Sequence, residues 1–206
     1  MLYTNTIERG TLELLKNISS NPVFSNFYLA GGTALALQVG HRKSIDLDFF
    51  CAAAFDVTAI SEALEHEYHA LLINQYPNTI LTEILGVKVD IISHQYKNLE
   101  KTSTIDGIRL AGKMDIAAMK LNALKNRGSK KDFIDIFFLL KQYSLKQLIA
   151  FHNIKYPNHN ELLILKSLTY FADADVEPEL LMLKSCNWEE VKNDISSHVN
   201  QYVREI

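Results

Sequence analysis

The first regular pattern of hydrophobic positions in the chain is helical. Its apolar residues recur at the spacing that places them on one face of a helix, and they are Ile7, Leu12, Leu15 and Ile18. We therefore predict a packing helix over Thr4–Ile18. The pair Asn21-Pro22 ends it, because proline cannot continue a helix, and Phe27–Leu29 is predicted as a short strand.

The middle of the chain carries the alternating pattern that is typical of strands. After a helix predicted over Val57–Tyr68, two strands are predicted over Ala70–Tyr76 and Thr79–Leu85. They flank Pro77-Asn78, a dipeptide that favours a turn, so we expect a hairpin. The alternation continues through Val87–Ile92, which is predicted as the next strand.

The second half of the chain is predominantly helical in pattern. Asn98–Gly107 is polar and predicted as a loop, and Ile108–Leu110 as a last short strand. Helical spacing begins at Lys113, and the segment 132–140 is apolar on most sides, which indicates a largely buried helix. The predicted fold class is α/β (α+β): a mixed sheet with flanking helices in domain 1–105, then a helical domain 106–206.

Composition and charge are those of an ordinary globular protein. The chain has 206 residues, of which 48% are hydrophobic and 22% charged, and this argues against disorder. The net charge of −3 provides no global basic field, so any RNA or nucleotide contact must use a local patch. Cys51 and Cys186 are too few for a disulfide framework, and we expect core thiols in a reducing compartment.

The sequence shows no signal for export or membrane insertion. The start, MLYTNTIERG, is polar where a signal peptide would be apolar. No apolar run approaches the ~20 residues that are needed to span a bilayer. We therefore expect a cytoplasmic protein that has no membrane partner.

The candidate chemistry begins with a glycine pair. Gly31 and Gly32 allow the backbone to turn tightly or to approach a ligand. Thr33 is placed to cap the helix predicted over Ala34–Val39. The unpaired amides at the start of a helix form a site for anions such as phosphate.

Two carboxylates follow in a predicted strand. Alternate residues of a strand share a face, so Asp46 and Asp48 project together with Cα atoms roughly 6.5 Å apart. Ile45, Leu47 and Phe49 are expected to point into a core. Magnesium binds one or two carboxylates plus substrate phosphates. A Gly-Gly turn alone is usually only a turn and an Asp-x-Asp pair alone is more often solvated, but together, with a basic pair between them, they indicate metal-dependent phosphoryl or nucleotidyl transfer.

This stretch resembles the first motif of the nucleotidyltransferase superfamily. More narrowly, it is similar to the AbiEii/AbiGii toxin-type nucleotidyltransferases, which include the MenT-like enzymes. Their pattern is Gly-Gly-Ser/Thr, an apolar helix, and then Arg-x-Ser-x-Asp-x-Asp. The matching residues here are Gly31, Gly32, Thr33, Arg42, Ser44, Asp46 and Asp48. The resemblance implies a nucleotidyltransferase-like sheet and the use of magnesium, with manganese as an alternative ion.

A third acid, Asp90, lies on the less apolar face of the strand predicted over Val87–Ile92. A buried acid is costly without a partner. Two interpretations are therefore open. In the first, Asp90 is a strand-end residue that meets solvent or a backbone cap. In the second, it is the acid that the nucleotidyltransferase fold places opposite the Asp-x-Asp pair. In the second case it completes the metal site with Asp46 and Asp48, or takes the proton from the attacking hydroxyl.

A basic cluster follows in the helical half. It comprises Lys120, Lys125, Arg127, Lys130 and Lys131. The cluster is either a solvated helix end whose cations complement the helix dipole, or a grip for a triphosphate or an RNA backbone. Lys120 and Arg127 are seven residues apart and so share a helix face.

The same segment resembles the later motifs of the family, in which Lys and Arg precede Lys/Arg-Asp-x-x-Asp and an apolar helix. The resemblance implies that Lys120 contacts the nucleotide phosphates and that Asp132 is a second acid of the catalytic site. Asp135 is interpreted as a helix-start or Arg-pairing residue. Without the resemblance, Asp132 would be interpreted as a helix N-cap.

The function that this resemblance implies is transfer of a nucleoside monophosphate from a nucleoside triphosphate to a hydroxyl group. The acceptor would be RNA, particularly the 3′ end of tRNA, and the enzyme a toxin paired with a cognate antitoxin. One alternative is a small-molecule acceptor, as in aminoglycoside nucleotidyltransferases, and another is a non-catalytic nucleotide-binding module. The predicted catalytic residues are Asp46, Asp48, Asp90, Lys120 and Asp132, and the predicted nucleotide-binding residues are Gly31, Gly32, Thr33, Arg42, Lys120 and Arg127.

Overall fold

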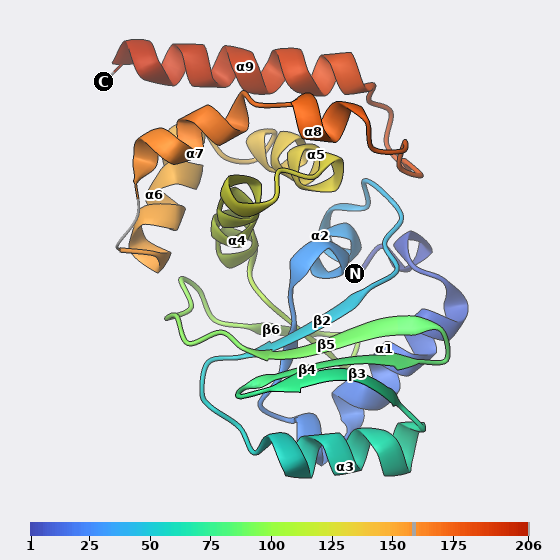
Figure 1. Cartoon of the computed structure of the whole chain (residues 1–206). Helices are drawn as coiled ribbons and strands as arrows, with labels where there is room; N and C mark the ends of the chain where they lie inside the picture. The colour runs from blue at the N-terminus through green and yellow to red at the C-terminus, as the bar shows by residue number, and fades with distance from the viewer. Residues whose placement is uncertain (158–159, 206) are drawn as a thin grey trace. The chain divides into compact units, whose positions relative to one another are not determined.

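The computed structural model describes residues 1–157 and 160–205 and divides the chain into two compact units (Figure 1). The units are Met1–Gly112 and Lys113–Ile206. The boundary lies later than the one we placed after residue 105. The strand Ile108–Leu110 therefore belongs to the first unit.

The first unit is built around a seven-stranded mixed sheet with the order β3-β4-β5-β2-β1-β7-β6. The central strand β2 pairs in parallel with β5 and antiparallel with β1. In this register Asp48 lies directly beside Asp90. The strands are β1 (Tyr28–Leu29), β2 (Leu47–Cys51), β3 (Leu71–Tyr76), β4 (Thr79–Ile84), β5 (Val87–Ser93), β6 (Ser103–Ile105) and β7 (Ile108–Leu110).

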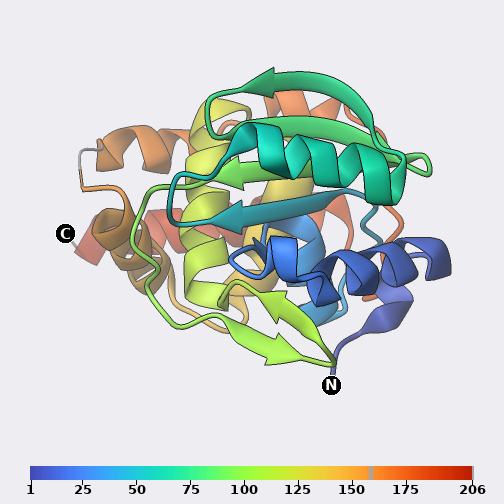
Figure 2. The same ribbon diagram turned by 90° about the horizontal axis from the view of Figure 1, so that it is seen from below.

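Helices cover both faces of this sheet. Two views show α1 (Arg9–Ser20) and α3 (Val57–Tyr68) on one face, and α2 (Gly31–Val39) on the other (Figures 1 and 2). The short 3-10 segments Thr4–Thr6 and Pro22–Phe24 precede and follow α1. The helix α2 is mostly apolar, and the residues from Thr33 to Leu37 are all buried, which fits its position against the sheet.

Most of the elements predicted for this unit are confirmed. The helix α3 has the predicted bounds, and the β3–β4 hairpin turns at Asn78, which adopts a positive φ of 61°. The predicted loop Asn98–Gly107 was wrong in its second half, because β6 forms a hairpin with β7 there. The sequence of β6 shows no hydrophobic alternation because this strand lies at the edge of the sheet and is mostly exposed.

The start of β2 also differs from the prediction. Leu47 and Phe49 are buried in the core, as expected, but Ile45 is 67% exposed. The strand begins only at Leu47, so the period-two alternation does not extend back to Ile45. Asp46 also lies before the strand, so the alternation of strand residues does not determine the direction of its side chain.

The second unit is helical. The long helix α4 packs against α5, α6 and α7, and α9 packs against the same three helices. A short helix, α8, precedes α9, and Asn187 caps α9 by accepting from the amide of Glu190. The helices are α4 (Lys113–Asn126), α5 (Lys130–Leu140), α6 (Leu145–Lys155), α7 (Glu161–Leu168), α8 (Ala172–Asp175) and α9 (Trp188–Glu205). Within the described residues, none of the helices combines the length and the hydrophobicity that crossing a bilayer requires.

Candidate active site

An acid pair lies at the centre of the sheet in the first unit. Asp48 of β2 and Asp90 of β5 are register partners on parallel strands, so their side chains project from the same face. Asp90 is only 7% exposed. Its Oδ1 is buried and has no hydrogen-bond partner among the described residues. A buried carboxylate oxygen without a partner is costly, so Oδ1 is a site for a hydrogen-bond donor or a cation.

Lys88 is the cation that the structure places beside these acids. Its Nζ lies 3.0 Å from Asp90 Oδ2. The hydrogen bond to Asp90 is the main cause that raises the pKa of Lys88, and the charges of Asp90, Asp46 and Asp48 raise it further. All three carboxylates therefore stabilise the charged form of Lys88. Sequence reasoning missed this residue, although its position two residues before Asp90 on the same strand face was a usable signal.

The carboxylates of the first unit are the candidate ligands for a metal ion. In the described parts of the chain, no three His, Cys, Asp or Glu side chains come together in a group that could hold a metal ion. Lys88 lies against one oxygen of Asp90, and the expected ligand set of Asp46, Asp48 and Asp90 stays a prediction. The residues still fit magnesium, which needs only one or two carboxylates when substrate phosphates supply further oxygen ligands.

Gly31 allows the close approach of α2 to Asp48. Its φ is +65°, a conformation that L side chains rarely adopt. A Cβ atom added here would lie 3.1 Å from Asp48 Cγ and would overlap Asp48 Oδ2. The first residue of the helix and the Asp48 carboxylate are therefore close together, which brings the start of α2, where helix amides lack intrahelical partners, next to the acid pair.

Replacing Gly31 with alanine should harm activity more than stability. The strained φ costs roughly 1–2 kcal/mol, and displacement of the Asp48 carboxylate should lower the transfer rate by about 100-fold. Gly10→Ala is the matched control, because no atom lies within 4 Å of its added Cβ. We expect that variant to keep its activity and to gain up to about 1 kcal/mol of helix stability. Steady-state rates and urea unfolding of both variants measure the two effects, and equal activity in both would contradict the assigned role of Gly31.

Thr33 has a different role from the predicted helix cap. The helix α2 starts at Gly31, and its N-cap residue Ala30 has no side-chain capping bond. The Thr33 hydroxyl instead donates to the carbonyl oxygen of Asp46, and its oxygen lies 2.8 Å from Ser44 Oγ. Thr33 thereby fixes the segment that carries Asp46. Its predicted contact with nucleotide phosphate stays a prediction.

Arg42, between the two motif halves, is largely buried. It is 4% exposed, and its Nη1 donates to the carbonyl oxygen of Lys43 at 3.0 Å. A buried guanidinium keeps its charge. The structure does not test the predicted contact of Arg42 with a nucleotide.

In the second unit, the predicted residues form a buried ionic network. Lys120 Nζ lies 2.8 Å from Asp132 Oδ1 and 2.6 Å from Asp135 Oδ2. Arg127 donates to both oxygens of Asp132, and Ser129 donates to one of them. Both aspartates are fully buried and Lys120 is 4% exposed. The network joins α4 to α5, and the expected roles of Lys120, Arg127 and Asp132 toward a nucleotide stay predictions.

Two residues of the predicted basic cluster, Lys120 and Lys130, are buried. Lys130 is only 2% exposed, and its Nζ donates to Glu177 O at 2.6 Å and to Glu179 Oε1 at 3.0 Å. Its ammonium also lies over the ring of Trp188, 5.3 Å from the centroid. Lys130 is thus held by partners within the unit. Whether the cations of this cluster contact a triphosphate or an RNA backbone stays a prediction.

The ionic network makes stability depend on pH. Burial alone would raise the pKa of Asp132, but the charge of Lys120 and the hydrogen bonds from Arg127 outweigh it and lower the pKa from 3.8 to about 2. A lowered carboxyl pKa contributes stability above the unfolded-state value, and that stability is lost as the pH falls toward the folded-state value.

We therefore expect the free energy of unfolding to fall by roughly 2 kcal/mol from this group between about pH 5 and about pH 2. The Asp132→Asn variant should be less stable at neutral pH but should show a flatter pH dependence over the same window. Urea titrations at several pH values measure both curves. Parallel curves for the two proteins would show that Asp132 does not titrate in this way.

Both the sequence and the fold resemble those of known proteins. The profile of the family described as nucleotidyl transferase AbiEii toxin, type IV toxin–antitoxin system, matches residues 13–96. The uncharacterized protein aq_aa25 of Aquifex aeolicus (strain VF5) is 37% identical over 210 residues, which cover 96% of this chain and 98% of that protein.

Two solved structures have a similar fold. One is MenT4, a nucleotidyltransferase toxin from Mycobacterium tuberculosis H37Rv, with a TM-score of 0.60 and 11% identity over 90% of this chain and 82% of that one. The other is the antibiotic-resistance factor ANT(2'')-Ia, with a TM-score of 0.52 and 13% identity over 70% of this chain and 91% of that one. At these identities the likeness shows the fold alone.

The family profile covers the part of the chain that contains Gly31, Asp48 and Asp90, the residues that meet at the centre of the sheet. The relative from Aquifex aeolicus is similar to this chain over nearly its whole length. The chain therefore belongs to the AbiEii toxin family and is a nucleotidyltransferase.

Proposed function

We propose that this enzyme transfers a nucleoside monophosphate from a nucleoside triphosphate to the 3′ end of an RNA, with tRNA as the foremost acceptor. The observation that carries the proposal is the acid pair Asp48–Asp90, set in register beside Lys88 and against the start of α2. Carboxylates next to a helix N-terminus can hold a metal-bound triphosphate, which needs negative ligands for the ion and amide donors for the phosphates.

Each residue of the first unit has a distinct part in this proposal. Asp46 and Asp48 hold magnesium, which when bound neutralises phosphate charge. The amides of Gly31 and Gly32 bind a phosphate at the start of α2. Asp90 accepts the proton from the attacking hydroxyl through Oδ1, the oxygen that Lys88 leaves open. Catalysis then rests on positioning and charge, as is usual for phosphoryl chemistry.

In the second unit, the ion pairs of Lys120 decide which residue can contact a phosphate. Lys120 has two carboxylate partners at 2.6 and 2.8 Å, so a direct contact with phosphate would replace one of them. Arg127 is more accessible, because its side chain is 56% exposed while it holds Asp132. We propose Arg127 as the phosphate-contacting residue of this unit, and Lys120 and Asp132 as the pair that orients it.

The choice of RNA over a small molecule follows the resemblance of the sequence motifs to the toxin-type nucleotidyltransferases, which implies an RNA acceptor, because the likeness to the two solved structures shows the fold alone. MenT4 is similar over 90% of this chain, whereas ANT(2'')-Ia, which has also been solved in complex with adenylyl-2''-tobramycin, is similar over 70%. The family description as a toxin of a type IV system supports a cognate antitoxin as partner. A small-molecule acceptor such as an aminoglycoside is the second candidate.

Pyrophosphate release tests the acceptor directly. The full-length protein is incubated with magnesium and each nucleoside triphosphate in turn, with total RNA, with tobramycin, or with no acceptor. We expect release that depends on RNA and on one or more nucleotides. Release that depends on tobramycin and not on RNA would overturn the RNA acceptor while retaining the transfer chemistry.

A further inference from the structure

A set of aromatic side chains begins two residues along β2 from the acid pair. In the strand register, Tyr28 of β1 pairs with Phe50 of β2, and Phe50 pairs with Ile92 of β5. Since alternate residues share a face, Phe50 projects on the same side of β2 as Asp48. The Cα atoms of Asp48 and Phe50 are separated by roughly 6.5 Å, the rise of two strand residues.

Phe50 is the first member of a continuous aromatic row that we define as Phe50, His94 and Tyr96. The rings of Phe50 and His94 are 5.6 Å apart in an edge-to-face arrangement, and those of His94 and Tyr96 are 4.9 Å apart. The backbone holds the row in place, because His94 donates its amide to Cys51 O and Tyr96 donates its amide to His94 O. Tyr96 is 44% exposed, so the outer end of the row is open to a ligand.

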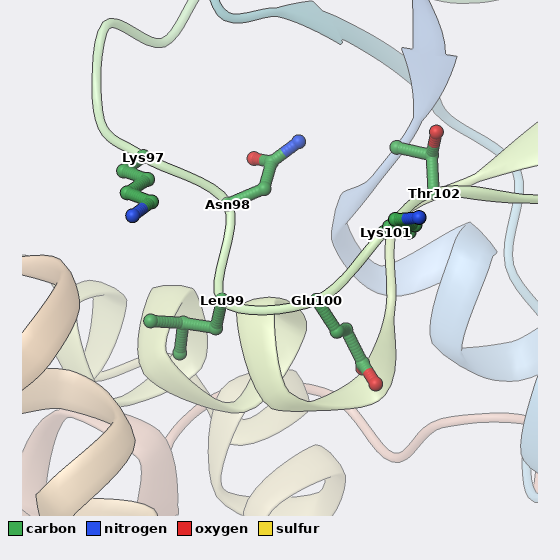
Figure 3. A pocket seen from close by; sticks show the side chains of 6 residues that line it. All are labelled: Lys97, Asn98, Leu99, Glu100, Lys101 and Thr102. Carbon is green, nitrogen blue, oxygen red and sulfur yellow. The ribbon is translucent and has the colours of Figure 1, made fainter.

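The loop that follows the aromatic row is polar and carries positive charge. Residues 97–102 line an open pocket of about 570 Å³, and Lys97 and Lys101 are both among its lining residues (Figure 3). Glu100 lies between them in the sequence and offsets part of the charge. Asn98 fixes the loop to the sheet by accepting a hydrogen bond of 3.0 Å from the Tyr28 hydroxyl. A stacking surface that is followed by lysines is the arrangement with which proteins hold single-stranded nucleic acid.

We propose that the aromatic row binds the terminal nucleobase of the acceptor RNA, and that Lys97 and Lys101 contact its backbone phosphates. This inference rests on the proposed RNA acceptor and names the part of the chain that holds it. The phosphates of the nucleoside triphosphate are assigned to the start of α2, beside Asp48. An RNA strand carries a phosphate at every nucleotide, so it accounts for lysines that lie beyond the stacking surface, which a single nucleotide does not.

The base preference should be weak, because stacking accepts any base. Removing one ring of the row should weaken RNA binding by about tenfold or more. Conservative exchanges of one aromatic ring for another should preserve binding, since the contact uses the ring face and not the hydroxyl group.

The test uses a single-stranded RNA oligonucleotide with 2-aminopurine at its 3′ end, whose fluorescence is quenched when the base stacks. The probe is titrated with the full-length protein in the absence of nucleoside triphosphate, so that no transfer occurs. We expect quenching by the wild type and by Phe50→Tyr and Tyr96→Phe, and weaker binding with loss of quenching in Phe50→Leu and Tyr96→Leu. Tyr96 is partly exposed, so its exchange should not disturb folding. Tyr76→Leu, at an exposed tyrosine of β3, is the matched control and should bind like the wild type.

Three results would overturn the proposal. The first is no quenching by the wild type, and the second is quenching and affinity that are unchanged in both leucine variants. The third is quenching of 2-aminopurine riboside triphosphate, but not of the RNA probe, in a manner that needs Phe50 and Tyr96, which would assign the row to the incoming nucleotide. Incorporation of labelled nucleotide into RNA by the same preparations separates these cases from a failure of the RNA acceptor itself.

Discussion

The Asp48→Asn variant is expected to lose about a thousandfold or more of its nucleotidyl-transfer rate while it keeps its fold. Asn retains the size of Asp and removes only the charge that would hold magnesium against the triphosphate. Loss of a group that stabilises charge in the transition state commonly costs this much. The rate of incorporation of α-labelled nucleotide at saturating magnesium measures the effect. The variant should be no less stable than the wild type, because the exchange removes one of the two like charges on the neighbouring residues Asp48 and Asp90.

The control for this variant is Asp173→Asn. Asp173 belongs to the other Asp-x-Asp sequence of the chain, lies in α8 and is exposed. Its exchange makes the same chemical change at a position without an assigned role, so its rate should equal that of the wild type. A comparable loss of activity in both variants would point to a nonspecific effect of the exchange, and near-normal activity of Asp48→Asn would contradict the site.

The Lys120→Met variant is expected to lose about 3–5 kcal/mol of the free energy of unfolding. Lys120 is the cation that bridges Asp132 and Asp135, and both carboxylates are fully buried. Removing it leaves two like charges close together in a region of low dielectric without the cation that bridges them. Urea unfolding at neutral pH, followed by circular dichroism, measures the loss.

Arg9→Met is the control for this second variant. Arg9 forms an ion pair with Glu13 in which both side chains are mostly exposed, at 92% and 61%. Exposed pairs of this spacing contribute about 0.3–0.5 kcal/mol. Each of the two variants thus removes one cation from an ion pair. The ion pairs of Lys120 are buried, whereas that of Arg9 is exposed. Losses of similar size would show that the Lys120 network is not the buried connection between α4 and α5 that the structure describes.

The sequence was sufficient to predict the elements that carry the acid pair. The alternation at Ile45–Phe49 and at Val87–Ile92 predicted two strands, and the period of two placed Asp48 and Asp90 on their less apolar faces. Gly31 could be recognised because a glycine pair before an apolar helix indicates a special backbone conformation. The resemblance to a known family then supplied what spacing alone does not, namely that the two strands are neighbours.

Other features depended on contacts that local patterns cannot reveal. Lys130 looked like a surface cation, but its partners Glu177 and Glu179 lie more than forty residues later in the chain. Thr33 looked like a cap, yet its hydroxyl is used by the carbonyl oxygen of Asp46. Lys88 was visible on the correct strand face but was not recognised, because its relation to the carboxylates of a neighbouring strand appears only in the folded sheet.

The most direct test of the account is incorporation of each α-labelled nucleoside triphosphate into total cellular RNA, in the presence of magnesium. The wild type is compared with the Asp46→Ala, Asp48→Ala double variant. The account predicts label in a tRNA-sized band with the wild type, and none with the double variant or when magnesium is chelated. Equal labelling by the wild type and the double variant would contradict the claim that these carboxylates form the catalytic centre.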